Sequence, residues 1–204
     1  MILSASVPNW PTLTDSAADA EPEELVARVE QIFHRHLDAV WRTARDLGVL
    51  PRDLEDVAQE VMVVCVRRLS DIDPERERAF LLATTARIAA NWRRARRRRP
   101  TESVESMEGL SIDAGAPQLR RDGPAELLEH KRELQVVQAA LEQMTEPQRI
   151  AFTLFEIEGL TAREIAHELG LSEPVVFARI QRARGVFHRY VERVRGPGHG
   201  GRSA

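Results

Sequence analysis

The sequence contains one cysteine, one lysine and few aromatic residues. A lone Cys65 cannot form an internal disulfide, which favours a reducing, cytoplasmic setting. Aromatic residues make up 5% of the chain, and Ala, Leu, Glu and Arg recur where β-branched runs would favour strands. No apolar run approaches the roughly 18–20 residues of a membrane span, and the N-terminus lacks the pattern of a signal peptide. We therefore expect an all-α cytoplasmic protein without membrane insertion.

The sequence also lacks the patterns of common catalytic and metal sites. Its six histidines are scattered, and the nearest pair, His34 and His36, is spaced i, i+2, which places the two rings on different faces of a helix. No phosphate-binding glycine loop and no nucleophile–base pair is recognisable. We expect no enzyme activity, no catalytic residue, no metal and no cofactor.

Charge is unevenly distributed along the chain. The formal net charge of −3 argues against nucleic-acid binding, but residues 86–99 hold seven arginines and no acid. Residues 101–129 instead hold seven acids with only Arg120 and Arg121. The average charge thus hides a local basic surface that suits phosphate. The plainer alternative for the basic run is a nonspecific basic tail.

Composition and periodicity divide the chain into five segments. We predict a disordered extension over residues 1–24, a helical domain over 25–99, a flexible acidic linker over 100–128, a second helical domain over 129–195 and a flexible tail over 196–204. In the first domain, helices are predicted from about Glu24 to Gly48, from about Pro51 to Leu69 and from about Pro74 to Arg99.

The segment "TAREIAHELGLSEPVVFARIQRAR" (161–184) predicts a helix-turn-helix. Thr161 begins a T-x-x-E capping box, and Gly170 supplies the left-handed residue that ends a helix. Ser172 is a suitable N-cap for the second helix. Pro174 then occupies the second helical position, where no backbone N–H is needed. The N-terminal part of such a second helix enters the DNA major groove; a plain helical hairpin is the alternative.

The segment "LEDVAQEVMVVC" (54–65) predicts a helix with an acidic face. Asp56, Gln59 and Glu60 are spaced i, i+3 and i+4, so they share one side of the helix. An acidic face suits a basic protein partner better than DNA. A solvated polar face is the alternative that this pattern alone favours.

Together the two segments resemble the extracytoplasmic-function (ECF) group of bacterial sigma factors, in the sigma-70 family. Leu54, Glu55, Asp56, Val57, Gln59 and Glu60 take the positions of the family form A-E-D-L-x-Q-E-x-F. Residues 80–94 resemble W-L-x-x-I-A-R-N-x-x-x-D-x-x-R-R, with Phe80 for Trp, Arg87 for Asn and Asn91 for Asp. In the helix-turn-helix, Pro174, Val175, Phe177 and Ala178 replace Gly, Thr, Lys and Ser.

The resemblance implies two domains, region two (25–99) and region four (129–195), that bind core RNA polymerase and promoter DNA. The implied polymerase partners are the β′ coiled coil, on which region two docks, and the β flap. The implied polymerase-binding residues are Leu54, Glu55, Asp56, Gln59 and Glu60. The implied minus-ten contacts are Arg87, Asn91, Trp92, Arg93, Arg94 and Arg97. The implied region-four contacts to DNA are Thr161, Arg163, Glu173, Val175, Phe177, Ala178, Arg179 and Arg182. An anti-sigma factor is a further candidate partner.

Several alternatives stay open on the sequence. A free-standing helix-turn-helix regulator is the second hypothesis for function, although it would not need the acidic helix. Trp92 either stacks on an unpaired base or packs against the first helix. Phe177 either faces DNA or belongs to the core.

Overall fold

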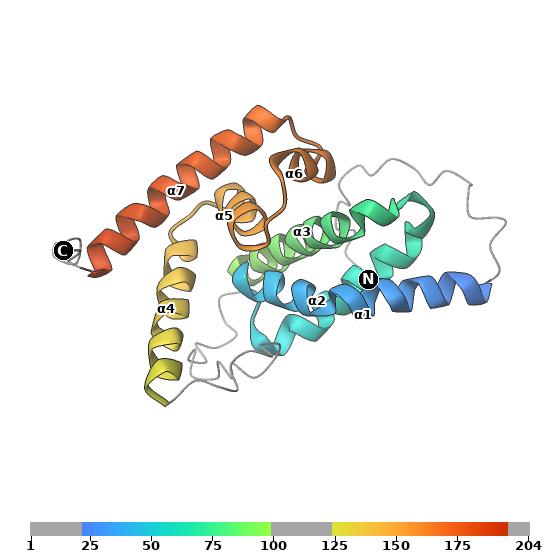
Figure 1. The fold of residues 1–204 in the computed structure, drawn as a ribbon, viewed down its shortest axis with the longest axis horizontal. Coiled ribbons are helices and arrows are strands. Elements are labelled where there is room, and N and C mark those ends of the chain that lie inside the picture. The colour runs from blue at the N-terminus through green and yellow to red at the C-terminus, as the bar shows by residue number, and fades with distance from the viewer. Residues whose placement is uncertain (1–21, 99–123, 196–204) are drawn as a thin grey trace, which may run out of the picture.

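A computed structural model of the chain describes residues 22–98 and 124–195, and all regular structure in these ranges is helical (Figure 1). Residues 1–21, 99–123 and 196–204 lie outside the described residues, and they hold most of the predicted extension (1–24), most of the predicted linker (100–128) and the whole predicted tail. The predicted end of the extension at residue 24 is wrong, because the first helix already begins at Pro22. The predicted all-α class is therefore confirmed for the described part.

Three helices form the first unit. They are α1 (Pro22–Asp46), α2 (Leu54–Arg67) and α3 (Glu77–Arg98), and each packs against the other two. The predicted second helix over Pro51–Leu69 is shorter in the structure, because 3₁₀ turns occupy Pro51–Asp53 and Leu69–Asp71 (η1 and η2). A further 3₁₀ turn, η3 (Pro74–Arg76), leads into α3. Fully buried aliphatic side chains from all three helices form the core: Val40, Val57, Val61, Leu81 and Leu82.

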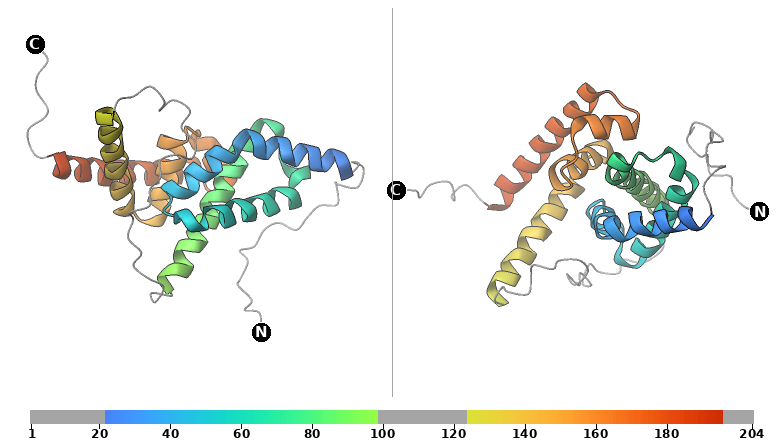
Figure 2. Two further views of the ribbon diagram at one scale, coloured as in Figure 1. Left: turned by 90° about the horizontal axis from the view of Figure 1, so that it is seen from below. Right: turned by 45° about the vertical axis from the view of Figure 1, so that its right-hand side comes forward.

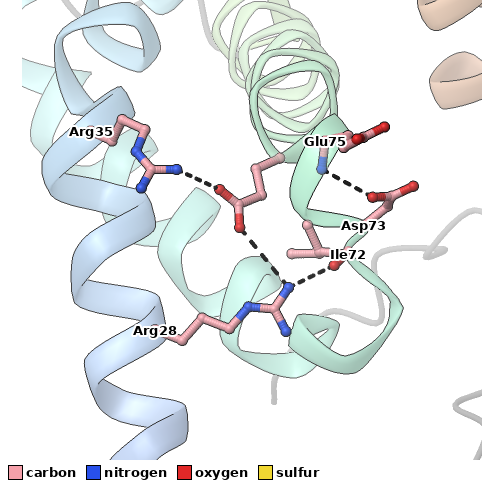
Figure 3. Close-up of polar contacts among 6 residues, drawn as sticks. Arg28, Arg35, Ile72, Asp73 and Glu75 are labelled. Atoms are coloured by element: carbon pink, nitrogen blue, oxygen red, sulfur yellow. Dashed lines mark hydrogen bonds and ion pairs between the residues drawn. The ribbon is translucent and has the colours of Figure 1, made fainter.

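An ion-pair network fixes the start of α3 against α1 (Figure 3). The buried carboxylate of Glu77 lies 3.3 Å from Arg35 Nη1 and 4.0 Å from Arg28 Nη2. Arg28 also donates to the carbonyl oxygen of Ile72 at 2.7 Å. Asp73 accepts from the backbone N–H two residues later and so caps η3. These contacts fix the direction in which the long helix α3 leaves the first unit.

The second unit comprises α4 (Pro124–Glu142), α5 (Glu146–Phe152), η5 (Thr153–Ile157), α6 (Ala162–Leu169) and α7 (Glu173–Arg195). Helix α7 contacts α4, α5 and α6, while the N-terminal end of α4 and the C-terminal end of α7 diverge (Figure 1). The predicted linker boundary at residue 128 is wrong for the helix start, because α4 already begins at Pro124. The prolines, glycines and acids of residues 100–128 indicated a linker, but Pro124 is also suited to the first turn of a helix, where its missing N–H is no loss.

The two units pack against each other (Figure 2). Helix α3 contacts α6, and α1 contacts η5. As a result, one apolar core runs from α1, α2 and α3 into α5, α6 and α7. A smaller cluster, with Leu141, Met144, Phe152 and Ala183, holds α4 and α5 to α7.

Candidate functional site

The outer face of α2 presents the acidic residues that the sequence singled out. Asp56, Gln59 and Glu60 are exposed, as is Glu55, while Leu54 is half-buried against the core. Three large apolar side chains are exposed on the same helix, with exposed fractions of 41% for Met62, 47% for Val63 and 54% for Val66. An acidic surface with exposed apolar side chains suits a protein partner, because a solvated face needs no apolar area.

A cleft of about 510 Å³ lies between α2 and α3 beside this face. Its lining combines acidic, basic and apolar side chains: Asp56, Gln59, Glu60, Val63, Val64, Arg67, Ile88 and Trp92. The indole Nε1 of Trp92 donates to Glu60 Oε1 at 3.0 Å. Trp92 thus contacts α2, which the sequence did not predict, and its stacking on an unpaired base stays a prediction.

Two of the residues that line the cleft could have been predicted from the helical spacing in the sequence. Val63 and Arg67 continue the i, i+3, i+4, i+7 series that starts at Asp56 and Gln59, so they lie on the same side of α2. The contribution of Ile88 and Trp92 depends on how α3 packs, and the sequence gives no such signal.

The arginines of α3 fall into anchored and exposed groups. Arg93 donates from Nη1 to the carbonyl oxygen of Leu47 at 2.9 Å, and burial lowers the pKa of its guanidinium. Arg94 donates to Asn91 Oδ1 at 2.6 Å and lies 3.7 Å from Glu146. The last turn is exposed and holds Arg96, Arg97 and Arg98. The exposed end of α3 therefore forms a basic surface, and Arg93 serves as an anchor to the end of α1.

The predicted helix-turn-helix forms between α6 and α7. Gly170 has φ +66° and ends α6, and Thr161 and Glu164 form the capping box, with Glu164 Oε2 accepting from the Thr161 backbone N–H at 2.7 Å. These hydrogen bonds from Thr161 lower the pKa of Glu164. Helix α7 begins at Glu173, so Pro174 is its second residue, as predicted.

The candidate DNA-reading side chains lie around the start of α7 and α6. Six are exposed: Thr161, Arg163, Glu173, Val175, Phe177 and Arg182. Ala178 and Arg179 are half-buried. The exposed fraction of Phe177 is 47%, so the alternative that it belongs to the core is wrong. Arg184, in contrast, pairs with Glu156 at 2.6 Å and lies over the Phe155 ring.

Comparison with known proteins identifies both units. Residues 32–99 match the family model Sigma-70 region 2, and residues 134–185 match Sigma-70, region 4. The sigma factor CnrH of Cupriavidus metallidurans is 32% identical over 76% of this chain and 81% of its own length. The chain belongs to the ECF group of the sigma-70 family. Like other sigma factors, it serves transcription initiation by binding core RNA polymerase and directing promoter recognition and melting, and a free-standing regulator is not favoured.

Other relatives and solved structures agree with this assignment. The sigma-E factor of Escherichia coli K12 is 30% identical over 65% of the chain and 70% of its own length. The structure of CnrH in complex with the cytosolic domain of CnrY is similar with a TM-score of 0.57 and 26% identity, covering 83% of this chain and 96% of that one. RpoE of Bartonella quintana, in complex with the anti-sigma factor NepR, shares the fold with a TM-score of 0.56 and 20% identity, over 81% and 97% of the two chains.

Ion pairs join region two and region four of this sigma factor. The side chain of Glu158 is fully buried between the units. Its carboxylate accepts from Arg42 Nε and Nη2 and from Arg78 Nη2, each at 2.9 Å. The hydrogen bond to Glu158 raises the pKa of Arg42. The five-residue π-helix η5 ends directly before Glu158, and its wider turn places this residue at the contact with α1.

A second contact covers one of the expected minus-ten residues. Arg87 is half-buried and donates to the carbonyl oxygen of Glu168 near the end of α6, and burial lowers the pKa of its guanidinium. In this closed arrangement α6 lies over Arg87, and Gln138 of α4 donates to Asp46 of α1 at 2.8 Å. Among residues 22–98 and 124–195, no helix is long and apolar enough to cross a membrane.

Proposed function

We propose that region two binds core polymerase through the outer face of α2 and the adjoining cleft. The observation that carries this proposal is the combination of exposed Asp56 and Glu60 with the apolar side chains of Val63 and Trp92 at one cleft. A basic helix with one or two apolar side chains complements such a surface, because its charges pair with the acids while its apolar groups leave water. The partner expected from the family is the β′ coiled coil, and region four is the expected partner of the β flap.

Promoter DNA is the proposed ligand of the basic end of α3 and of the N-terminal part of α7. The exposed arginines at the end of α3, Arg96, Arg97 and Arg98, are suited to phosphate and carry affinity without base preference. The exposed N-terminal part of α7 is suited to the major groove. Arg87 has to leave the carbonyl of Glu168 before it reaches DNA, so minus-ten contact through this residue requires the units to separate.

The remaining proposals concern cellular setting. We place the protein in the cytoplasm without catalytic activity of its own, since sigma factors are non-catalytic subunits that meet polymerase there. An anti-sigma factor is a proposed partner, because RpoE was solved with the anti-sigma factor NepR and CnrH with the cytosolic domain of CnrY.

Charge reversal tests the polymerase surface. The variant Asp56→Arg with Glu60→Arg should keep its fold, because both side chains are exposed, and should bind core polymerase at least about tenfold more weakly, or about 1.4 kcal/mol. The matched control reverses two exposed acids elsewhere, Glu30→Arg with Glu133→Arg. Gel-filtration co-elution with core polymerase and a titration of affinity measure the effect. Equal affinity of the folded variant and the control would refute the assignment of this surface.

A further inference from the structure

The first two turns of α7 present an apolar surface to solvent. Val175 and Phe177 have exposed fractions of 40% and 47%, and Pro174 between the helix start and Val175 is also exposed. Val176 and Ile180 are fully buried, which fixes the inward side of the helix. Each residue turns the helix by 100°, so Ala178 lies on the side of α7 opposite Val176 and Ile180, and Val175 and Phe177 lie on either side of Ala178. Among the exposed side chains of these two turns only that of Glu173 can form hydrogen bonds, and the exposed Gln181 and Arg182 follow in the next turn on the same side.

The surroundings of this apolar surface are basic. Arg182 is exposed one turn beyond Ala178 on the same outward side, and Arg179 lies next to it, half-buried. Arg163 is exposed near the start of α6, the neighbouring helix of the helix-turn-helix. Three arginines around one exposed acid form a surface that suits a polyanion better than it suits an apolar protein partner. The charge pattern thus selects DNA as the occupant.

One feature of DNA in the major groove is apolar. Thymine presents its C5-methyl group there beside the O4 acceptor, while the other bases present only hydrogen-bond donors and acceptors at their edges. An aliphatic and an aromatic side chain without hydrogen-bonding groups distinguish thymine by burying that methyl group. They gain nothing from guanine or cytosine, whose polar edges lose water without finding a partner.

We propose that Val175 and Phe177 make region four a reader of thymine methyl groups in the upstream promoter element. This inference deepens the proposed DNA-binding function of α7 and rests on it. Arg182, on the same side of the helix, binds phosphate and supplies affinity that does not depend on sequence. Burial of one methyl group per contact corresponds to about a fourfold change in affinity.

Exchange of thymine for uracil tests the methyl group alone, since uracil keeps the pairing edge and O4. The probe is a pool of promoter duplexes randomised over the upstream element, synthesised once with thymine and once with uracil in that element. Holoenzyme made from core polymerase and the full chain selects from both pools. We expect T·A pairs to be enriched at two or more positions of the thymine pool. Winning sequences remade with uracil should bind about fourfold more weakly per methyl group lost.

Two variants make the test specific. Val175→Ser with Phe177→Ser should bind thymine and uracil versions equally, while Val194→Ser, another exposed apolar residue of α7, should discriminate as the parent does. Equal recovery of the same sequences from both pools by the parent would overturn the inference, as would discrimination that survives in the double variant. A double variant that loses core polymerase would show that this surface binds protein, and would also overturn it. Failure of the parent chain to co-elute with core polymerase would instead refute the proposed function itself.

Discussion

Glu158 forms ion pairs that hold region two and region four in the closed arrangement. It belongs to region four, and both of its partners, Arg42 and Arg78, belong to region two. The substitution Glu158→Gln keeps the size of the side chain but removes its charge, and it turns an amide group toward one of the guanidinium groups. We expect the two regions to separate more readily in this variant.

The size of the effect follows from burial and exposure. Removing one partner of a buried ion pair costs about 3–5 kcal/mol. The carboxylate of Glu158 is fully buried, but the side chains of Arg42 and Arg78 are 40% and 38% exposed, so solvent screens part of the interaction. We therefore expect a loss of about 2 kcal/mol, which lowers the ratio of closed to open molecules roughly 30-fold.

Small-angle X-ray scattering of the free protein measures the separation directly, and thermal unfolding measures stability. The matched control is Glu77→Gln, because Glu77 is also a buried glutamate with two arginine partners, Arg28 and Arg35, but all three lie within region two (Figure 3). The control should lose stability at an unchanged radius of gyration. The reasoning is refuted if Glu158→Gln also keeps the parent's radius of gyration while it loses stability.

Three further predictions concern single features. Burial raises the pKa of Asp46, so the folded state loses stability as pH rises from the ordinary aspartate pKa through the raised one. The variant Asp46→Asn should therefore have a higher melting temperature than the parent at neutral pH, and this gain should shrink in acid. A gain in melting temperature that is the same at all pH values would contradict this cause. Burial raises the pKa of Cys65 to about 11, so a thiol reagent at pH 8 should label it only after unfolding, and fast labelling of the native protein would contradict its burial. Neutralising Arg96, Arg97 and Arg98 should weaken promoter binding on all sequences alike. The slope of log affinity against log salt concentration should become shallower by roughly 0.7–0.9 per lost phosphate contact. A loss of affinity that depends on promoter sequence, at an unchanged salt slope, would show that these residues read bases instead.

Local features of the fold could be predicted from the sequence because they depend on neighbours along the chain. The capping box at Thr161, the left-handed Gly170 and the position of Pro174 in α7 are all confirmed. The exposed acidic face of α2 with Val57 buried behind it also follows from helical periodicity. The start of α4 was placed too late, because the composition of residues 100–128 indicated a linker although Leu127 and Leu128 already belong to the periodic pattern.

Contacts between the two units could not be predicted in this way. Arg42 and Glu158 are 116 residues apart, and nothing in the local pattern of either indicates the other. Nearly every residue from Ala79 to Ala90 of α3 is buried, so periodicity marks no single inner side and does not indicate that α6 lies over Arg87. The hydrogen bond between Trp92 and Glu60 likewise depends on how α2 and α3 cross.

Transcription in vitro tests the central claim most directly. Core RNA polymerase with the purified chain, acting on sheared genomic DNA of the source organism, should produce transcripts with defined start sites that are absent with core enzyme alone. Addition of the chain carrying Asp56→Arg and Glu60→Arg should restore few of them. Defined DNA binding by the chain without any chain-dependent start site would contradict the account and would indicate a regulator that acts without joining polymerase.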